Sequence, residues 1–124
     1  MHRVWIAVLV CAVAACSSLA LANGASAGDG AQELRTSCDQ FRLGSTYITS
    51  LKQRNTKCGT AKKVATKFTE CRKKNGGANG HCNQKVAHYS CNEGSRSGNK
   101  FQYNARVKCQ RGGNKVNFTY TQQK

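Results

Sequence analysis

The stretch FQYNARVKCQRGGNKVNFTY, residues 101–120, decides the fold. Apolar residues alternate with polar ones on both sides of Gly112-Gly113, which predicts two strands that each bury one face. The glycine pair suits the tight turn of an antiparallel hairpin. The side chains predicted to face inward are those of Phe101, Tyr103, Ala105, Val107, Cys109, Val116, Phe118 and Tyr120. The predicted outward set is polar and basic and comprises Lys100, Gln102, Asn104, Arg106, Lys108, Lys115, Asn117 and Thr119.

Residues 59–74 carry the clearest helical periodicity in the chain. The apolar positions that share one face, and so predict an amphipathic helix, are Ala61, Val64, Ala65, Phe68 and Cys71. Asn55 or Thr56 is predicted to cap the start of this helix, and Asn75-Gly76-Gly77 is typical of its end. Arg72 lies near the apolar face, so its side chain must extend to solvent, or the helix frays before it.

The other predicted strands are shorter than the two arms of the hairpin. Tyr47-Ile48-Thr49 indicates one, and the alternation over residues 86–91 predicts another. Together these elements predict an α+β fold, with one amphipathic helix packed on a small antiparallel sheet of three to four strands. We expect one small disulfide-stapled domain over residues 38–124, and a monomer.

Residues 1–27 have the pattern of a secretory signal peptide, with a basic start and an uncharged apolar run. An A-x-A site that ends at Ala27 suits cleavage and release from the membrane. The sequence VAAC that ends at Cys16 instead resembles a bacterial lipobox, in which this cysteine is acylated and holds the protein on the membrane. A retained anchor over residues 4–22 ranks third, since about 20 apolar residues span a bilayer. We therefore expect a secreted protein, or one that is membrane-anchored through a lipid, with a flexible lead-in at residues 28–37.

The six cysteines beyond the leader are Cys38, Cys58, Cys71, Cys82, Cys91 and Cys109. An even set in a short exported chain predicts three disulfides and an oxidising compartment. The cysteines are separated by 19, 12, 10, 8 and 17 residues, whereas zinc ligands usually come in pairs two to four residues apart, so no metal site is expected. Fifteen pairings are open. Our hypothesis joins Cys58 to Cys109, Cys71 to Cys82, and Cys38 to Cys91.

The composition is strongly basic, with 20 Lys and Arg against five Asp and Glu, a net charge of +15. Such an excess attracts polyanions such as nucleic acid, acidic polysaccharide or teichoic-acid-like polymers. The predicted outward set of the hairpin makes Lys100, Arg106, Lys108 and Lys115 the candidate anion-binding residues. This set contains no aromatic residue, and surfaces that bind single-stranded nucleic acid usually expose aromatics for base stacking. Sequence-specific recognition of nucleic acid is therefore not supported.

Catalysis is the competing interpretation, and it rests on two histidines. His81 and His88 could act as general acid and base in a small secreted hydrolase, most simply a nuclease, with Glu70 or Glu93 as a second partner. A histidine in a loop or strand more often has a surface role, so we assign no catalytic residue. The glycine pairs match neither a P-loop nor a dinucleotide fingerprint, so we expect no cofactor.

NTKCGTAKKV at residues 55–64 is similar to the pattern Asn-Thr-Ser-Cys-x-x-Ala-Arg-x-Val, which is typical of a family of small Cys-containing domains found in exported actinobacterial proteins. Tyr89-Ser90-Cys91 and Cys109-Gln110-Arg111-Gly112 resemble its later signature, an aromatic-x-Cys and a Cys followed by a basic residue and Gly. The resemblance implies export, an α+β fold and a cross-link among Cys58, Cys91 and Cys109, and it transfers no activity.

These observations favour a non-catalytic, secreted or envelope-associated basic module. Its expected ligand is an anionic polymer, a component of the cell envelope or a protein partner. The alternative is the small hydrolase that uses His81 or His88.

Overall fold

The computed structural model describes residues 36–124. The predicted signal peptide at residues 1–27, Cys16 and most of the lead-in at residues 28–37 lie outside the described residues. The described chain forms one helix and seven strands, with the bounds β1 Thr36–Cys38, β2 Phe41–Leu43, β3 Thr46–Arg54, α1 Cys58–Lys74, β4 Ser90–Glu93, β5 Ser97–Gly98, β6 Gln102–Arg111 and β7 Asn114–Gln123. A short 3-10 turn at Gly77–Asn79 follows α1.

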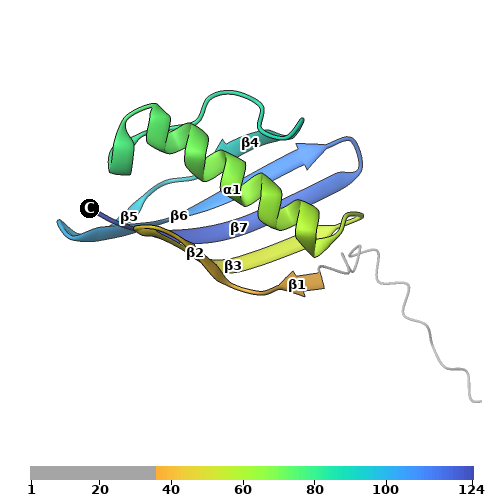
Figure 1. The fold of residues 1–124 in the computed structure, drawn as a ribbon, viewed down its shortest axis with the longest axis horizontal. Coiled ribbons are helices and arrows are strands. Elements are labelled where there is room, and N and C mark those ends of the chain that lie inside the picture. The colour runs from red at the N-terminus through yellow and green to blue at the C-terminus, as the bar shows by residue number, and fades with distance from the viewer. Residues whose placement is uncertain (1–35) are drawn as a thin grey trace, which may run out of the picture. The chain divides into compact units, whose positions relative to one another are not determined.

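The strands form one antiparallel sheet in the order β1-β3-β7-β6-β4, with β2 paired to β3 and β5 paired to β6. Helix α1 lies across one face of this sheet (Figure 1). The predicted α+β architecture is confirmed, but the sheet has seven strands rather than three to four. The additional strands β1, β2 and β5 are two to three residues long, too short to give a periodic pattern.

The central hairpin β6-β7 has the predicted form. Arg111 pairs with Asn114 across a two-residue turn, and Gly112 adopts a φ of +55°. The inward residues of both strands are buried between the sheet and α1, with Phe101 as the exception at 69 % exposed. The chain bends before β6, because the Asn99 side chain accepts hydrogen bonds from the backbone N–H groups of Phe101 and Gln102. The alternation therefore begins at Gln102 and leaves Phe101 outside the core.

The strand predicted over residues 86–91 is wrong in its first half. Val86 and Tyr89 form an isolated bridge that closes a tight turn, with Ala87 and His88 at φ values of 47° and 67°. The strand itself, β4, starts at Ser90. An apparent period of two in a short segment cannot distinguish a strand from this turn.

Helix α1 begins one residue before the predicted start and ends at the predicted residue, and the buried apolar face is as predicted. Its N-cap is Lys57 without a side-chain cap. Asn55, one of the two predicted caps, instead has a φ of 55° and donates a hydrogen bond to the carbonyl of Gly113 in the hairpin turn. The helix ends as predicted, since Gly76 and Gly77 both have positive φ.

Three disulfides join Cys38 to Cys58, Cys71 to Cys82, and Cys91 to Cys109. The Cys71–Cys82 link was predicted, while the other two pairings correct our hypothesis. Cys91 and Cys109 are cross-strand partners in the register of β4 and β6. Cys38 lies in β1, which contacts α1, and is linked to Cys58, the first residue of this helix. The sequence could not show these neighbours, because β1 and the start of β4 were not recognised.

The three disulfides are consistent with an oxidising compartment such as the space outside the cell. Within residues 36–124, no helix is long and apolar enough to cross a membrane.

Arg72 is fully buried, which corrects the expectation that it extends to solvent or that the helix frays. Its guanidinium donates hydrogen bonds to Ala78 O and Tyr103 Oη at 2.8 Å, and to Thr46 Oγ1 and Gln122 Oε1 at 3.2 and 2.5 Å. It also stacks over the ring of Tyr120, with its central carbon 4.7 Å from the centroid. The last turn of α1 is therefore fixed to the sheet and to the segment that follows the helix.

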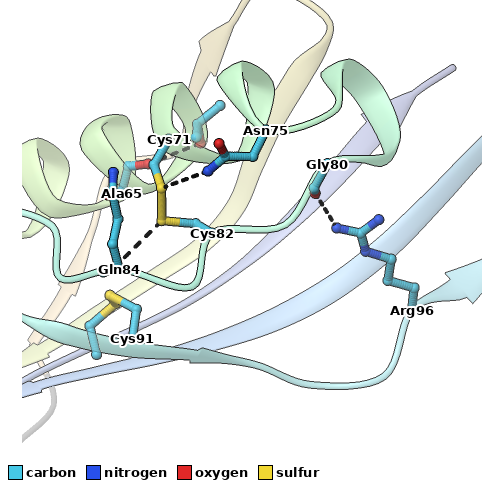
Figure 2. The surroundings of a disulfide bond; sticks show 10 residues. Ala65, Cys71, Asn75, Gly80, Cys82, Gln84, Cys91 and Arg96 are labelled. Carbon is cyan, nitrogen blue, oxygen red and sulfur yellow. Dashed lines mark hydrogen bonds between the residues drawn. A yellow bond between two sulfur atoms is a disulfide. The ribbon is translucent and has the colours of Figure 1, made fainter.

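The segment between α1 and β4 is held at several points (Figure 2). The Cys71–Cys82 disulfide links it to the helix, and Asn75 Nδ2 approaches Cys71 Sγ at 3.7 Å. Arg96 donates hydrogen bonds to the carbonyls of Asn79 and Gly80 at 2.7 and 2.5 Å. Gly80 is required here, because a Cβ at this position would lie 2.0 Å from Arg72 O.

Candidate functional site: a basic sheet face

The face of the sheet turned away from α1 carries a set of polar and basic side chains, which we call the open sheet face. The strand alternation that buries the core residues sends the intervening residues to this side. The open sheet face comprises Ser50, Lys52 and Arg54 of β3, Asn92 of β4, Arg106, Lys108 and Gln110 of β6, and Lys115, Asn117 and Thr119 of β7.

The strand register aligns these residues in rows across the sheet. One row runs from Lys52 through Asn117 and Lys108 to Asn92. Because neighbouring strands lie about 4.8 Å apart, Lys52 and Lys108 are about 10 Å apart at the backbone. The next row along the strands places Arg106 beside Thr119. Within the first row an amide therefore separates the two cations, whereas Arg106 and Lys108 stand two residues apart on β6 and Arg54 is paired with Lys115 across β3 and β7.

Three shallow hollows of about 580, 570 and 550 Å³ lie on this face. Lys108 lines all three, and Arg106 lines two of them. The hollows therefore adjoin and form one extended polar surface centred on β6.

No acidic side chain among the described residues lines these hollows. Glu93 of β4 faces the interior, with its side chain 8 % exposed and its carboxylate 2.5 Å from Arg96 Nε. Lys52, Arg106 and Lys108 have no ion-pair partner within residues 36–124. Their charges are therefore not neutralised by the folded domain.

The structure brings three of the four predicted anion-binding residues, Arg106, Lys108 and Lys115, to the open sheet face. Lys100 lies instead in the bend before β6, where its Nζ sits 5.0 Å from the centroid of the Phe101 ring. Sequence reasoning missed Lys52, because a bulge between Ile48 and Ser50 interrupts the alternation of β3. The alternation Leu51-Lys52-Gln53-Arg54 after the bulge was the available signal.

The two histidines lie in different settings. His81 lines a separate hollow of about 310 Å³ with Glu93, and its Nδ1 is 3.3 Å from Arg96 Nη2. His88 is exposed in the tight turn before β4 and is not among the residues that line this hollow. The Glu93 carboxylate is engaged by Arg96 rather than directed to a substrate. The hydrolase alternative stays a prediction.

Arg96 contacts both Glu93 and His81, and its role is structural. Burial is the largest single influence and opposes the charge on its guanidinium, but the hydrogen bond and charge of Glu93, with contributions from Tyr120 and Tyr103, together outweigh it, so the pKa of Arg96 is raised. The guanidinium also lies over the ring of Tyr103 at 4.7 Å. Its polar groups are committed to the fold, which makes it a poor candidate for ligand binding.

Within residues 36–124 no group of three metal-ligating side chains comes together, and all six described cysteines are in disulfides. No family model, curated protein or solved structure matches this chain. The open sheet face is therefore the candidate site on its geometry and charge.

Proposed function

We propose that the open sheet face binds a linear anionic polymer outside the cell, without catalysis. The observation that supports this is the presence of Lys52, Arg106 and Lys108 on adjoining hollows with no acidic side chain and no ion-pair partner within the described chain. Unneutralised cations on one face give a positive potential that attracts polyanions and raises their association rate.

The chemistry of this face favours a polyanion whose backbone bears hydroxyl groups, such as an acidic polysaccharide or a polyol phosphate. Asn117 stands between Lys52 and Lys108, while Asn92 and Thr119 are paired with Lys108 and Arg106. All three can exchange hydrogen bonds with hydroxyl groups. No exposed aromatic side chain lines the three hollows, so stacking with nucleic-acid bases has no platform there.

Replacing Lys52, Arg106 and Lys108 together with glutamine is expected to weaken heparin binding by roughly 100-fold at about 0.1 M salt. The estimate follows from the release of about 0.8 counterion per neutralised anionic group, and the slope of log affinity against log salt should decrease by about two to three. Affinity is measured by titration calorimetry at several salt concentrations.

The matched control replaces Lys57, Lys85 and Lys100, which are exposed elsewhere, and gives the same net charge. If both triple variants lose the same affinity, binding depends on net charge alone and the open sheet face has no special role. Poly(glycerol phosphate) should bind in the same way as heparin. Tighter binding to single-stranded DNA with a preference among bases would contradict the polymer class that we propose.

We further propose that the protein is exported and is either released after Ala27 or held on the membrane through acylated Cys16. Expression of the whole chain in an actinobacterial host separates these routes. Release places the protein in the medium with Gly28 as its first residue, and Cys16→Ser leaves it there. Acylation places it in the detergent phase, and Cys16→Ser moves it out. Retention in the cytoplasm would contradict both routes.

A further inference from the structure

A second basic surface lies on the outer face of α1. Lys63, Lys67, Glu70 and Lys74 are all exposed and follow each other at helical spacing, so they form one stripe along the helix. We call them the helix stripe. Because α1 covers one face of the sheet, the helix stripe and the open sheet face lie on opposite sides of the domain (Figure 1).

The helix stripe keeps an excess of positive charge. Glu70 is the single acid in α1, and it accepts a hydrogen bond from Lys67 Nζ at 2.8 Å. This hydrogen bond lowers the pKa of Glu70, so the carboxylate stays ionised and offsets one lysine. Lys63 is in no ion pair within residues 36–124, and Lys74 acts on Glu70 only through its charge, without a close contact.

The two basic surfaces are too far apart to act as one. An α-helix with its side chains is about 10–12 Å across, and the sheet adds a further layer. At physiological salt the Debye length is about 8 Å, so each surface attracts anions with little help from the other. A polymer chain that lies along one surface leaves the other available.

We propose that the helix stripe is a second binding surface for a polyanion, so that one molecule bridges two polymer chains. This inference rests on the proposed function of the open sheet face and adds cross-linking to it. The ligand class is the same, a linear polyanion, because lysines spaced at one helical turn offer charge without a base-stacking or apolar contact.

The test counts short ligands per molecule and measures cross-linking of long ones. A heparin octasaccharide, titrated by calorimetry, should bind at two per molecule, and long-chain heparin should give turbidity near charge balance. Replacing Lys63, Lys67 and Lys74 with glutamine should reduce the count to one and abolish the turbidity. The triple glutamine substitution at Lys52, Arg106 and Lys108 on the open sheet face should also reduce the count to one and abolish the turbidity.

Two further variants separate charge from damage to the helix. Substituting arginine at the same three helix positions should keep two octasaccharides and the turbidity. Glu70→Gln removes the only acid of the stripe and should tighten the helix-side binding about fivefold at about 0.1 M salt, the effect of one additional counterion released.

The outcomes distinguish this inference from the proposed function. If the wild type binds one octasaccharide and the helix glutamine variant binds one with unchanged affinity, the bridging inference is wrong while the function of the open sheet face stands. Turbidity that survives the helix glutamine variant also overturns it. If no octasaccharide binds at low salt, both fail.

Discussion

Replacing Arg72 with methionine should lower the free energy of unfolding by about 3 kcal/mol. Methionine keeps the unbranched stem but leaves Thr46, Gln122 and Tyr103 without the cation that now donates to them inside the core. Hydrogen bonds to a charged group contribute about 1.5–3 kcal/mol each. Burying a charge also costs free energy, because the charged group loses its hydration on folding, so methionine avoids this desolvation cost. The loss of several hydrogen bonds to a charged group is expected to exceed the desolvation free energy that is avoided.

Urea denaturation followed by circular dichroism measures the change. Arg106→Met is the matched control, because this arginine is exposed on the same sheet and should change stability by less than about 0.5 kcal/mol. The triple variant Arg72→Met, Thr46→Val and Gln122→Leu should recover part of the loss, since it also removes the acceptors that would be left buried. If Arg72→Met alone is as stable as the wild type, the buried network contributes nothing to folding.

The position of Arg72 was the least predictable feature of the core. Its hydrogen-bond acceptors come from β3, the 3-10 turn, β6 and β7, so no local sequence pattern predicts them. Burial also raises the pKa of the Tyr120 phenol and outweighs the opposing charge of Arg72, so the ring under the guanidinium stays neutral. A helix periodicity argument treats an arginine on the apolar face as misplaced, whereas the fold supplies its partners from distant segments.

What the sequence did predict depends on long, uninterrupted patterns. The helix and the hairpin each repeat their period over ten or more residues, and their buried apolar residues were assigned correctly apart from Phe101. Strand β3 is nine residues long, but its bulge shifts the register, so only its first half was recognised. The bulge also explains which residues of the candidate site were predicted. The alternation of β6 assigned Arg106 and Lys108 to the outward face, whereas the interrupted alternation of β3 did not assign Lys52.

Replacing Cys71 and Cys82 with alanine should lower the free energy of unfolding by about 3 kcal/mol. Their sequence separation is 11 residues, and a loop of this length loses about that much closure entropy when the unfolded chain is cross-linked. The disulfide also holds the segment after α1, whose Ala78 carbonyl accepts hydrogen bonds from Arg72 and Tyr103. Its removal should therefore weaken those bonds as well.

A double-mutant cycle can detect this coupling. Tyr103→Phe removes the hydroxyl that donates to Ala78 O and is mild enough to combine with the Cys71/Cys82 variant. Because both changes loosen the same segment, their effects on unfolding free energy should depart from additivity by about 0.5–1 kcal/mol. The Cys38–Cys58 disulfide lies at the opposite end of α1. Removing it should lower the free energy of unfolding by about the same amount, and this effect should add to that of Tyr103→Phe without coupling. Only the Cys71–Cys82 disulfide is attached to the segment after α1. If Tyr103→Phe shows the same coupling energy with both disulfides, the coupling does not arise from this segment.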